Sequence, residues 1–159
     1  MGTMIQPTWV ASRMVVVVGV DFSHQGEIAF DFACAIAKNI GRADIHAVHA
    51  ISLAPLPYSD DSLDVAPHLD VATERRRLDE LCVRAGPGQR IVRHIVLAGA
   101  ERAILDVARE QRADLIVLGT HRKSGIERLL TGSVVDRIVR SAPCSVLVSR
   151  PQVGAAAPG

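Results

Sequence analysis

Two runs of branched apolar residues constrain the fold of this chain more than any other feature of its sequence. Residues Met14–Val20 contain five valines and no polar side chain, and Leu115–Leu118 are all aliphatic. A strand with one face in water alternates apolar and polar residues, whereas a strand covered on both faces is apolar throughout. Both runs therefore predict buried strands in a sheet that is packed on both sides.

The elements expected around these runs alternate in type along the chain. Strands are expected at 14–20, 44–51, 90–97, 115–118 and 145–149, and helices at 24–40, 69–85 and 100–112, with a last helix beginning near Ser133. Such alternation implies right-handed crossovers and a parallel sheet with helices on both faces. The predicted fold is α/β, a three-layer sandwich on a five-stranded parallel sheet. Arg93 and His94 favour an edge position for the third strand.

The first helix carries clear signals at both ends. Ser23 is placed to cap it, and Gly41 is well placed to end it. Large apolar residues recur within it at helical spacing and predict its buried stripe, flanked by Ala29, Ala33 and Ala37. These residues are Ile28, Phe32, Ile36 and Ile40.

A single domain is expected from a chain of 159 residues. Residues 1–12 show no periodicity and are expected to form a flexible N-terminal arm, and residues 151–159 a flexible tail. The domain itself would span 13–150. Within it, 52–67 contains three prolines and three aspartates and predicts a long surface loop.

Composition argues against several functional classes. The formal net charge is +1 and aromatic residues make up 3% of the chain, so nucleic acid is not expected as a partner. The cysteines Cys34, Cys82 and Cys144 form no C-x-x-C pair, which favours reduced, buried thiols. The run at 14–20 is too short to cross a membrane, and its flanks do not resemble a secretory signal. We therefore expect a soluble, cytoplasmic protein with no membrane partner.

Two histidines of the second strand invite a metal interpretation that its geometry disfavours. His46 and His49 are three residues apart on a strand, so they are expected to face opposite sides of the sheet. We therefore expect no metal site there.

The residues around the fourth strand predict a binding site for an anion. Gly119 follows the strand directly, Gly132 and Ser133 open the last helix, and Ser133 with Asp136 matches a capping box. Loop amides and a helix N-terminus both favour an anion such as phosphate. If the first and fourth strands are neighbours, Asp21 also lies close to Gly119 at the carboxyl edge of the sheet. The alternative is that Gly119 only ends a strand and Ser133 only caps a helix.

Several segments resemble the universal stress protein family. They are V-G-V-D-F-S after the first strand, A-D-L-I-V-L-G-T-H at the fourth, and R-L-L-T-G-S-V with A-P-C-S-V-L-V near the end. The resemblance covers about residues 13 to 150. It implies a Rossmann-like sheet of the adenine nucleotide alpha hydrolase type, in strand order 3-2-1-4-5. It also implies a homodimer that forms through the last strand, Ser145–Ser149.

The nucleotide-binding branch of that family carries the motif G-x-x-G-x(9)-G-[ST]. Gly119, Gly132 and Ser133 match it, whereas Arg122 replaces the second glycine. A side chain at a position that needs a positive φ costs about 1 kcal/mol. A guanidinium can nevertheless bind phosphate oxygens in a bidentate manner. By matching positions, the resemblance implies the following nucleotide-binding residues: Gly19, Asp21, Ala50, Leu118, Gly119, Arg122, Gly132, Ser133 and Val134.

The expected function is that of a regulatory module in the stress response that binds an adenine nucleotide, ATP, and acts as a homodimer. Mg²⁺ is expected to bind together with the ATP. The alternative is a family member that binds no nucleotide and acts through protein contacts. An enzyme is less expected, because the chain has no G-x-S-x-G, H-E-x-x-H or G-x-x-x-x-G-K-[ST] motif. The family resemblance leaves room for slow ATP hydrolysis at most.

Overall fold

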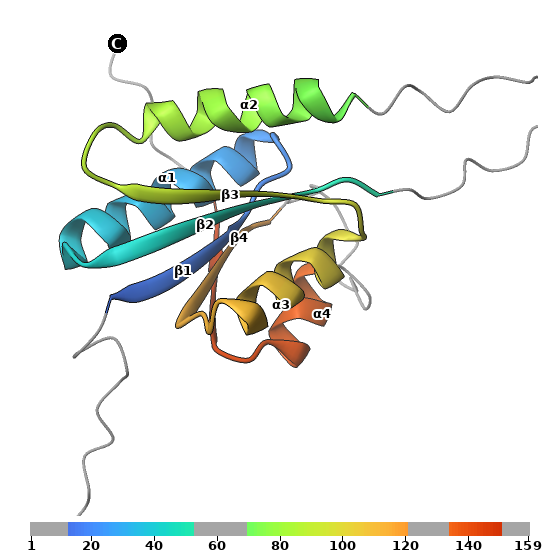
Figure 1. Ribbon diagram of the computed structural model, residues 1–159. Coiled ribbons are helices and arrows are strands. Elements are labelled where there is room, and N and C mark those ends of the chain that lie inside the picture. The colour runs from blue at the N-terminus through green and yellow to red at the C-terminus, as the bar shows by residue number, and fades with distance from the viewer. Residues whose placement is uncertain (1–12, 53–69, 121–133, 151–159) are drawn as a thin grey trace, which may run out of the picture.

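Five parallel strands form the sheet of this protein, and helices cover both of its faces (Figure 1). The computed structural model describes residues 13–52, 70–120 and 134–150. The strands are β1 (Met14–Gly19), β2 (Ala43–Ala50), β3 (Arg90–Val96), β4 (Leu115–Gly119) and β5 (Ser145–Ser149). The helices are α1 (His24–Ile40), α2 (Val71–Arg84), α3 (Ala100–Glu110) and α4 (Val134–Ser141). The strand order is β3-β2-β1-β4-β5, which confirms the predicted fold class and topology.

The valine-rich first strand lies at the centre of the sheet. β1 pairs with β2 on one side and with β4 on the other, where Val16 lies opposite Leu115. Val16, Val17 and Val18 are completely buried, as the unbroken apolar run predicts. The chain winds toward β3 from β1 and toward β5 from β4, so the winding direction reverses between these two central strands.

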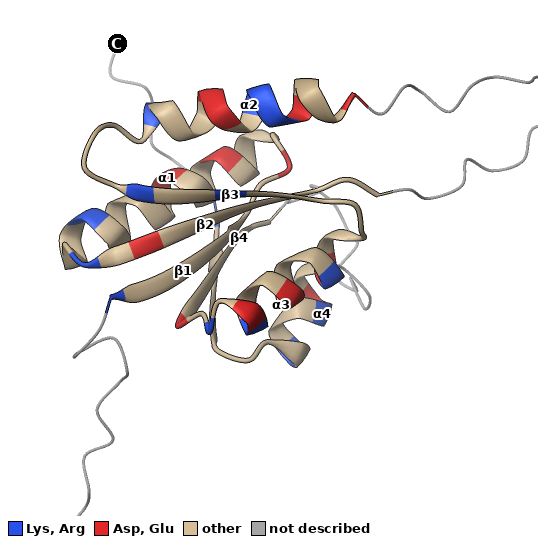
Figure 2. Cartoon of the chain, viewed as in Figure 1, with Lys and Arg blue, Asp and Glu red and all other residues tan. Residues whose placement is uncertain are grey.

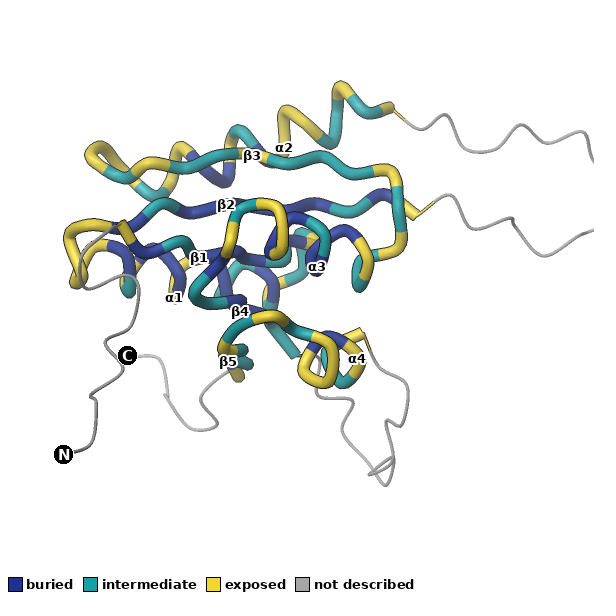
Figure 3. Tube along the Cα trace, turned by 60° about the horizontal axis from the view of Figure 1, so that its bottom comes forward, coloured by how far each residue is buried: buried dark blue, intermediate teal, exposed yellow. Residues whose placement is uncertain are grey.

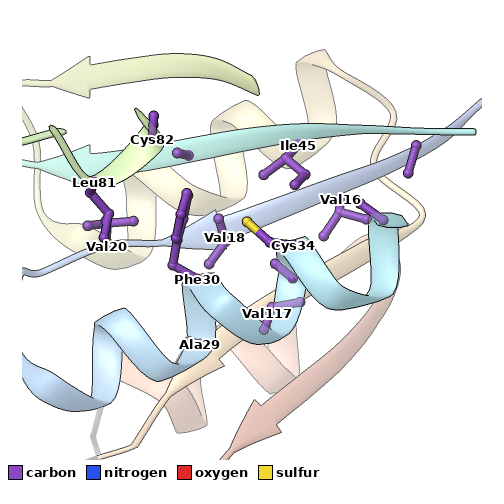
Figure 4. Close-up of a cluster of buried hydrophobic side chains, with 14 of the residues drawn as sticks. Val16, Val18, Val20, Ala29, Phe30, Cys34, Ile45, Leu81, Cys82 and Val117 are labelled. Atoms are coloured by element: carbon purple, nitrogen blue, oxygen red, sulfur yellow. The ribbon is translucent and has the colours of Figure 1, made fainter. Parts of the chain in front are cut away.

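Each face of the sheet has its own apolar core. Val16 and Val18 pack with α1 and α2 on one face, in a cluster centred on Phe30 (Figure 4). Val17 points to the other face and packs with α3 and α4, where Ile138 is completely buried. This division follows from the alternation of side chains along a strand. Figure 3 shows the resulting gradient, with the deepest burial along β1 and β2 and more exposure at the sheet edges.

The buried face of α1 differs from the predicted stripe. Phe32 is 47% exposed and Ile40 is 37% exposed, whereas Ala29, Ala33 and Ala37 are buried. Phe30 and Cys34 are buried as well. The small alanines let the helix backbone approach the sheet, so the neighbouring row of larger residues is displaced to the side of the helix. The prediction was wrong because two apolar rows lie side by side on this helix, and residue size favoured the other row.

Both predicted ends of α1 are confirmed. The Ser23 hydroxyl accepts a hydrogen bond from Gly26 N at 3.1 Å. Gly41 adopts a left-handed conformation with a φ of 72°, and its N–H donates to Ala37 O at 3.0 Å. These are the cap geometries that serine and glycine favour. The predicted capping box at Ser133, residues 53–67 of the loop predicted at 52–67, the arm at 1–12 and the tail at 151–159 lie outside the described residues.

The edge strands and the histidines follow the sequence predictions. β3 is an edge strand, and β5 forms the other edge. His46 contacts His94 of β3, with 2.9 Å between Nδ1 and Nε2, whereas His49 contacts Val20 O on the opposite face. The two histidines of β2 therefore point to opposite faces, as expected.

The cysteines agree only in part with the prediction of buried thiols. Cys34 and Cys82 are free and buried, whereas Cys144 is free but only partly buried. Burial, with a smaller contribution from the charge of Asp31, raises the pKa of the Cys34 thiol to about 12. Burial also raises the pKa of the other two thiols.

Among the described helices, none has the length and apolar character that crossing a membrane requires.

Candidate functional site

A cavity of about 480 Å³ opens at the carboxyl ends of the central strands. Its walls come from β1, β2, β4 and β5 and from the N-terminal parts of α1, α3 and α4. It lies where the winding direction of the sheet reverses, which is the usual ligand position in open α/β sheets. The cavity is therefore the strongest candidate for a binding site among the described residues.

The structure brings most of the predicted binding residues to this cavity. Those that line it are Gly19, Asp21, Ala50, Leu118, Gly119 and Val134. Asp21 and Gly119 come from strands that are far apart in sequence but adjacent in the sheet. Arg122, Gly132 and Ser133 lie outside the described residues. The first and fourth strands are neighbours, as expected, and Asp21 and Gly119 line the same cavity.

The inner wall of the cavity is apolar and fits closely around Gly19. Val48, Ile104 and Leu118 contribute aliphatic side chains to it. A Cβ added at Gly19 would lie 2.8 Å from Ile104 Cδ1 and 3.2 Å from Leu118 Cδ2. A side chain at this position would therefore crowd Ile104 and Leu118 on the cavity wall.

Asp21 begins the turn that joins β1 to α1. Its Oδ1 accepts hydrogen bonds from Ser23 N at 3.0 Å and from Ser23 Oγ at 2.6 Å. Gly26 makes room for this carboxylate, because an added Cβ would collide with Asp21 Oδ1 and lie 3.3 Å from Asp21 Cγ. Asp21 is consequently held in place by the same serine that caps the helix, and its exposed carboxyl group lies on the wall of the cavity.

Gly119 has a packing role that is independent of any ligand. A Cβ added to it would lie 2.6 Å from the Gln25 carbonyl carbon and 3.0 Å from Gly26 N. These are backbone atoms of the first turn of α1, so they cannot move aside as a side chain could. The absence of a side chain therefore lets the end of β4 pack against the start of α1.

A cluster of side chains packs beside the Asp21 turn, on the face of the sheet that α1 and α2 cover. Phe22 has a positive φ of 55°, which is uncommon for a residue other than glycine. Its ring lies 4.5 Å from the ring of His49, and the guanidinium of Arg77 lies 4.2 Å from its centre. His49 Nδ1 donates to Val20 O at 2.8 Å, and its Nε2 lies 3.3 Å from Glu74 Oε2. Side chains of helix α2 thus pack around Phe22, the residue with positive φ beside Asp21.

The remaining residues of the cavity wall are not among the predicted binding residues. They are Val20, Gly26, Val48, Ala100, Ile104, Thr120, Val135, Val148 and Arg150. Thr120 and Arg150 directly follow β4 and β5, so their position at the carboxyl edge is a signal that the sequence does carry. Ile104 is a buried apolar residue of α3, and no sequence pattern distinguishes a cavity wall from a packed core.

Comparison with known proteins assigns the chain to a family. The model of the universal stress protein family matches residues 13–150. A universal stress protein of Methanocaldococcus jannaschii is 31% identical over 137 residues, which cover 84% of this chain and 79% of the relative. A putative universal stress protein of Staphylococcus epidermidis is 34% identical over 142 residues, which cover 85% of this chain and 82% of the relative.

Solved structures agree with this assignment. A universal stress protein crystallised in complex with cAMP is 26% identical and has a TM-score of 0.66, and the match covers 87% of this chain and 98% of that one. A protein from Arabidopsis thaliana with AMP bound is 17% identical at a TM-score of 0.60, over 87% of this chain and 92% of that one, and therefore supports the fold alone. Because the family match spans every strand of the sheet and relatives above 30% identity share the family name, this chain belongs to the universal stress protein family.

Proposed function

We propose that this protein binds an adenine nucleotide, with ATP as the expected ligand, and works as a regulatory module of the stress response. The observation that carries the proposal is the cavity where the ends of β1 and β4 meet the first turn of α4. Its volume of about 480 Å³ lies within the range of roughly 300–1,000 Å³ that is typical of small-molecule sites. The relative crystallised with cAMP supports an adenine nucleotide as the ligand class.

The distribution of side chains matches the parts of such a ligand. The aliphatic wall at Val48, Ile104 and Leu118 suits an adenine ring. The carboxylate of Asp21 is an acceptor for ribose hydroxyl groups. Val134 and Val135 place the first turn of α4 on the cavity wall, so the positive end of that helix favours phosphate nearby.

The remaining parts of the proposal concern residues outside the described ranges. Gly132 and Ser133 immediately precede α4 and would offer backbone amides to the phosphates, and Arg122 would lie in the same loop. Mg²⁺ bound with ATP would neutralise part of the phosphate charge. We further propose that the protein acts in the cytoplasm as a homodimer formed through β5.

Ligand-dependent stability tests nucleotide binding directly. The melting temperature would be measured with ATP and Mg²⁺ for the wild type and for Asp21→Asn. At a ligand concentration of 100 times Kd, the stabilisation should be about 2.7 kcal/mol. For a domain of this size, that is a shift of roughly 5–10 °C. Asp21→Asn keeps an oxygen that accepts from Ser23 but loses the charge, so it should fold normally and show a smaller shift.

The replacement of a motif glycine by Arg122 favours a second candidate, a family member that binds no nucleotide and acts through protein contacts. Mass spectrometry of small molecules released from freshly purified wild type and Arg122→Gly protein separates the two. Nucleotide in both preparations supports the proposal. An empty wild type beside a loaded Arg122→Gly variant would identify the arginine as a block and favour the second candidate.

A further inference from the structure

Arg150 contributes a basic side chain to the cavity wall. It directly follows β5 and lines the cavity. Ser149 lies opposite Gly119 in the sheet, and Thr120 N donates to Ser149 O at 3.3 Å, so β4 and β5 stay paired to their ends. Because side chains alternate along a strand, Arg150 follows Val148 onto the cavity side.

The two charged residues of the described cavity wall follow different strands of the sheet. Among the described residues that line it, Asp21 is the one acid and Arg150 is the one base. Asp21 follows β1 and Arg150 follows β5, with β4 between them. Two strand spacings place the ends of these strands roughly 10 Å apart. A ligand whose uncharged, hydroxyl-bearing part lies at Asp21 would therefore extend an anionic part toward Arg150.

The guanidinium of Arg150 differs from those of its neighbours in having no acidic partner among the described residues. On the adjacent helix α4, Arg137 pairs with Glu101, and Arg140 pairs with Asp136 at 3.2 Å. Figure 2 shows basic and acidic residues interspersed on α3 and α4. Arg150 is exposed and forms no such pair with a described acid, so its charge is available to an anion that enters the cavity.

We infer that Arg150 binds the phosphate groups of the nucleotide and makes the site selective for phosphorylated ligands over nucleosides. This inference rests on the proposed function and names the side chain that recognises the charge. A guanidinium presents a planar fork that matches two phosphate oxygens. The first turn of α4 lies on the same wall and adds its positive end. A nucleoside can contact the aliphatic wall and Asp21 but has no phosphate group for Arg150 to bind.

Binding of three ligands by four proteins tests the inference. Affinities for ATP, AMP and adenosine would be measured by calorimetry with the wild type, Arg150→Met, Arg150→Lys and the control Arg102→Met. Arg102 is a highly exposed arginine of α3 that is not part of the cavity wall. Arg150→Met should weaken ATP binding about tenfold or more and leave adenosine binding unchanged. Arg150→Lys should be intermediate, because it keeps the charge and loses the fork. The control should match the wild type.

A shallower salt dependence of ATP affinity in Arg150→Met would give independent support, because one charge contact is lost. Equal weakening of ATP and adenosine would overturn the inference, since it would indicate a distorted cavity. Unchanged ATP affinity in Arg150→Met would overturn the inference alone and leave nucleotide binding standing. A wild type that binds none of the three ligands would overturn the proposed function and this inference together.

Discussion

At the scale of single residues, the glycines of the cavity are explained by the backbone that approaches them. Gly119 lies against the carbonyl carbon of Gln25, and Gly26 lies against the carboxylate of Asp21. The first contact involves backbone and the second a side chain, so the two positions differ in how much they can adapt. Glycine at position 119 therefore serves the packing of β4 on α1 before any phosphate is considered.

Gly119→Ala is expected to lower the free energy of unfolding by about 1–3 kcal/mol, because the added methyl group overlaps backbone atoms that cannot move freely. Urea unfolding of the ligand-free protein measures this change. Gly99→Ala is the matched control, since its added Cβ meets open space; the expected cost is below about 1 kcal/mol, the usual size of a lost N-cap preference. Equal costs at the two positions would contradict the packing role assigned to Gly119.

At the scale of elements, β2 and β3 are joined by a stacked pair of histidines. The rings of His46 and His94 lie 5.2 Å apart at an interplanar angle of 23°. Burial lowers the pKa of His46, and the neighbouring His94 lowers it further, against the opposing charge of Asp44. Burial likewise lowers the pKa of His94, against the opposing charge of Glu110. Both rings are thus favoured in the neutral form in the folded protein.

The lowered pKa values of His46 and His94 predict that the protein loses stability in mild acid. The folded-state pKa of each ring is below its usual value of 6.5, so the unfolded chain takes up protons first as the pH falls. The free energy of unfolding should therefore decrease as the pH falls through 6.5, until the folded rings are protonated too. Chemical unfolding of the wild type and His94→Gln between pH 7.5 and pH 5 measures this slope.

His94→Gln should show a shallower decline, because it removes one of the two shifted groups and the repulsion between them. The same slope in both proteins would show that the pair does not govern acid stability. His46→Gln offers a second comparison with the same expected direction.

At the scale of the whole molecule, β5 forms an edge of the sheet with no further strand beside it among the described residues. The amide of Thr120 donates to Ser149 O, so the backbone of Ser149 faces β4. Strand geometry then directs the backbone groups of Val146 and Val148 outward. The proposed homodimer would use this open edge, because unpaired strand groups are a template for a second copy.

Val146→Pro is expected to convert the proposed dimer to a monomer while the domain stays folded. Proline removes an N–H that points away from β4 and is tolerated on edge strands. Light scattering coupled to size-exclusion chromatography measures the mass, and circular dichroism monitors the fold. Val146→Ala retains the N–H and should remain dimeric. A dimer of unchanged affinity in the proline variant would place the interface elsewhere.

The success of sequence reasoning depended on how local each signal was. The caps of α1 at Ser23 and Gly41 are set by neighbouring residues, and both were predicted correctly. The buried row of α1 was not, since Ile28–Ile40 offers two apolar rows and only contact with the sheet selects the one with small side chains. Asp21 and Gly119 were expected at the carboxyl edge because each directly follows a predicted strand, and both line the cavity. Arg150 follows a strand too, but its significance required the position of β5 in the sheet.

The sequence by itself determined the strand and helix content, the burial of the central strands and the family of this protein. These properties depend on runs of adjacent residues, because hydrophobic periodicity and helix capping act over short stretches of the sequence. Only the tertiary structure decided which helix face is buried, which glycine packs against backbone, and that one cavity wall carries the carboxylate of Asp21 and the guanidinium of Arg150. Those properties depend on distances between residues far apart in sequence, and packing of the whole sheet sets such distances.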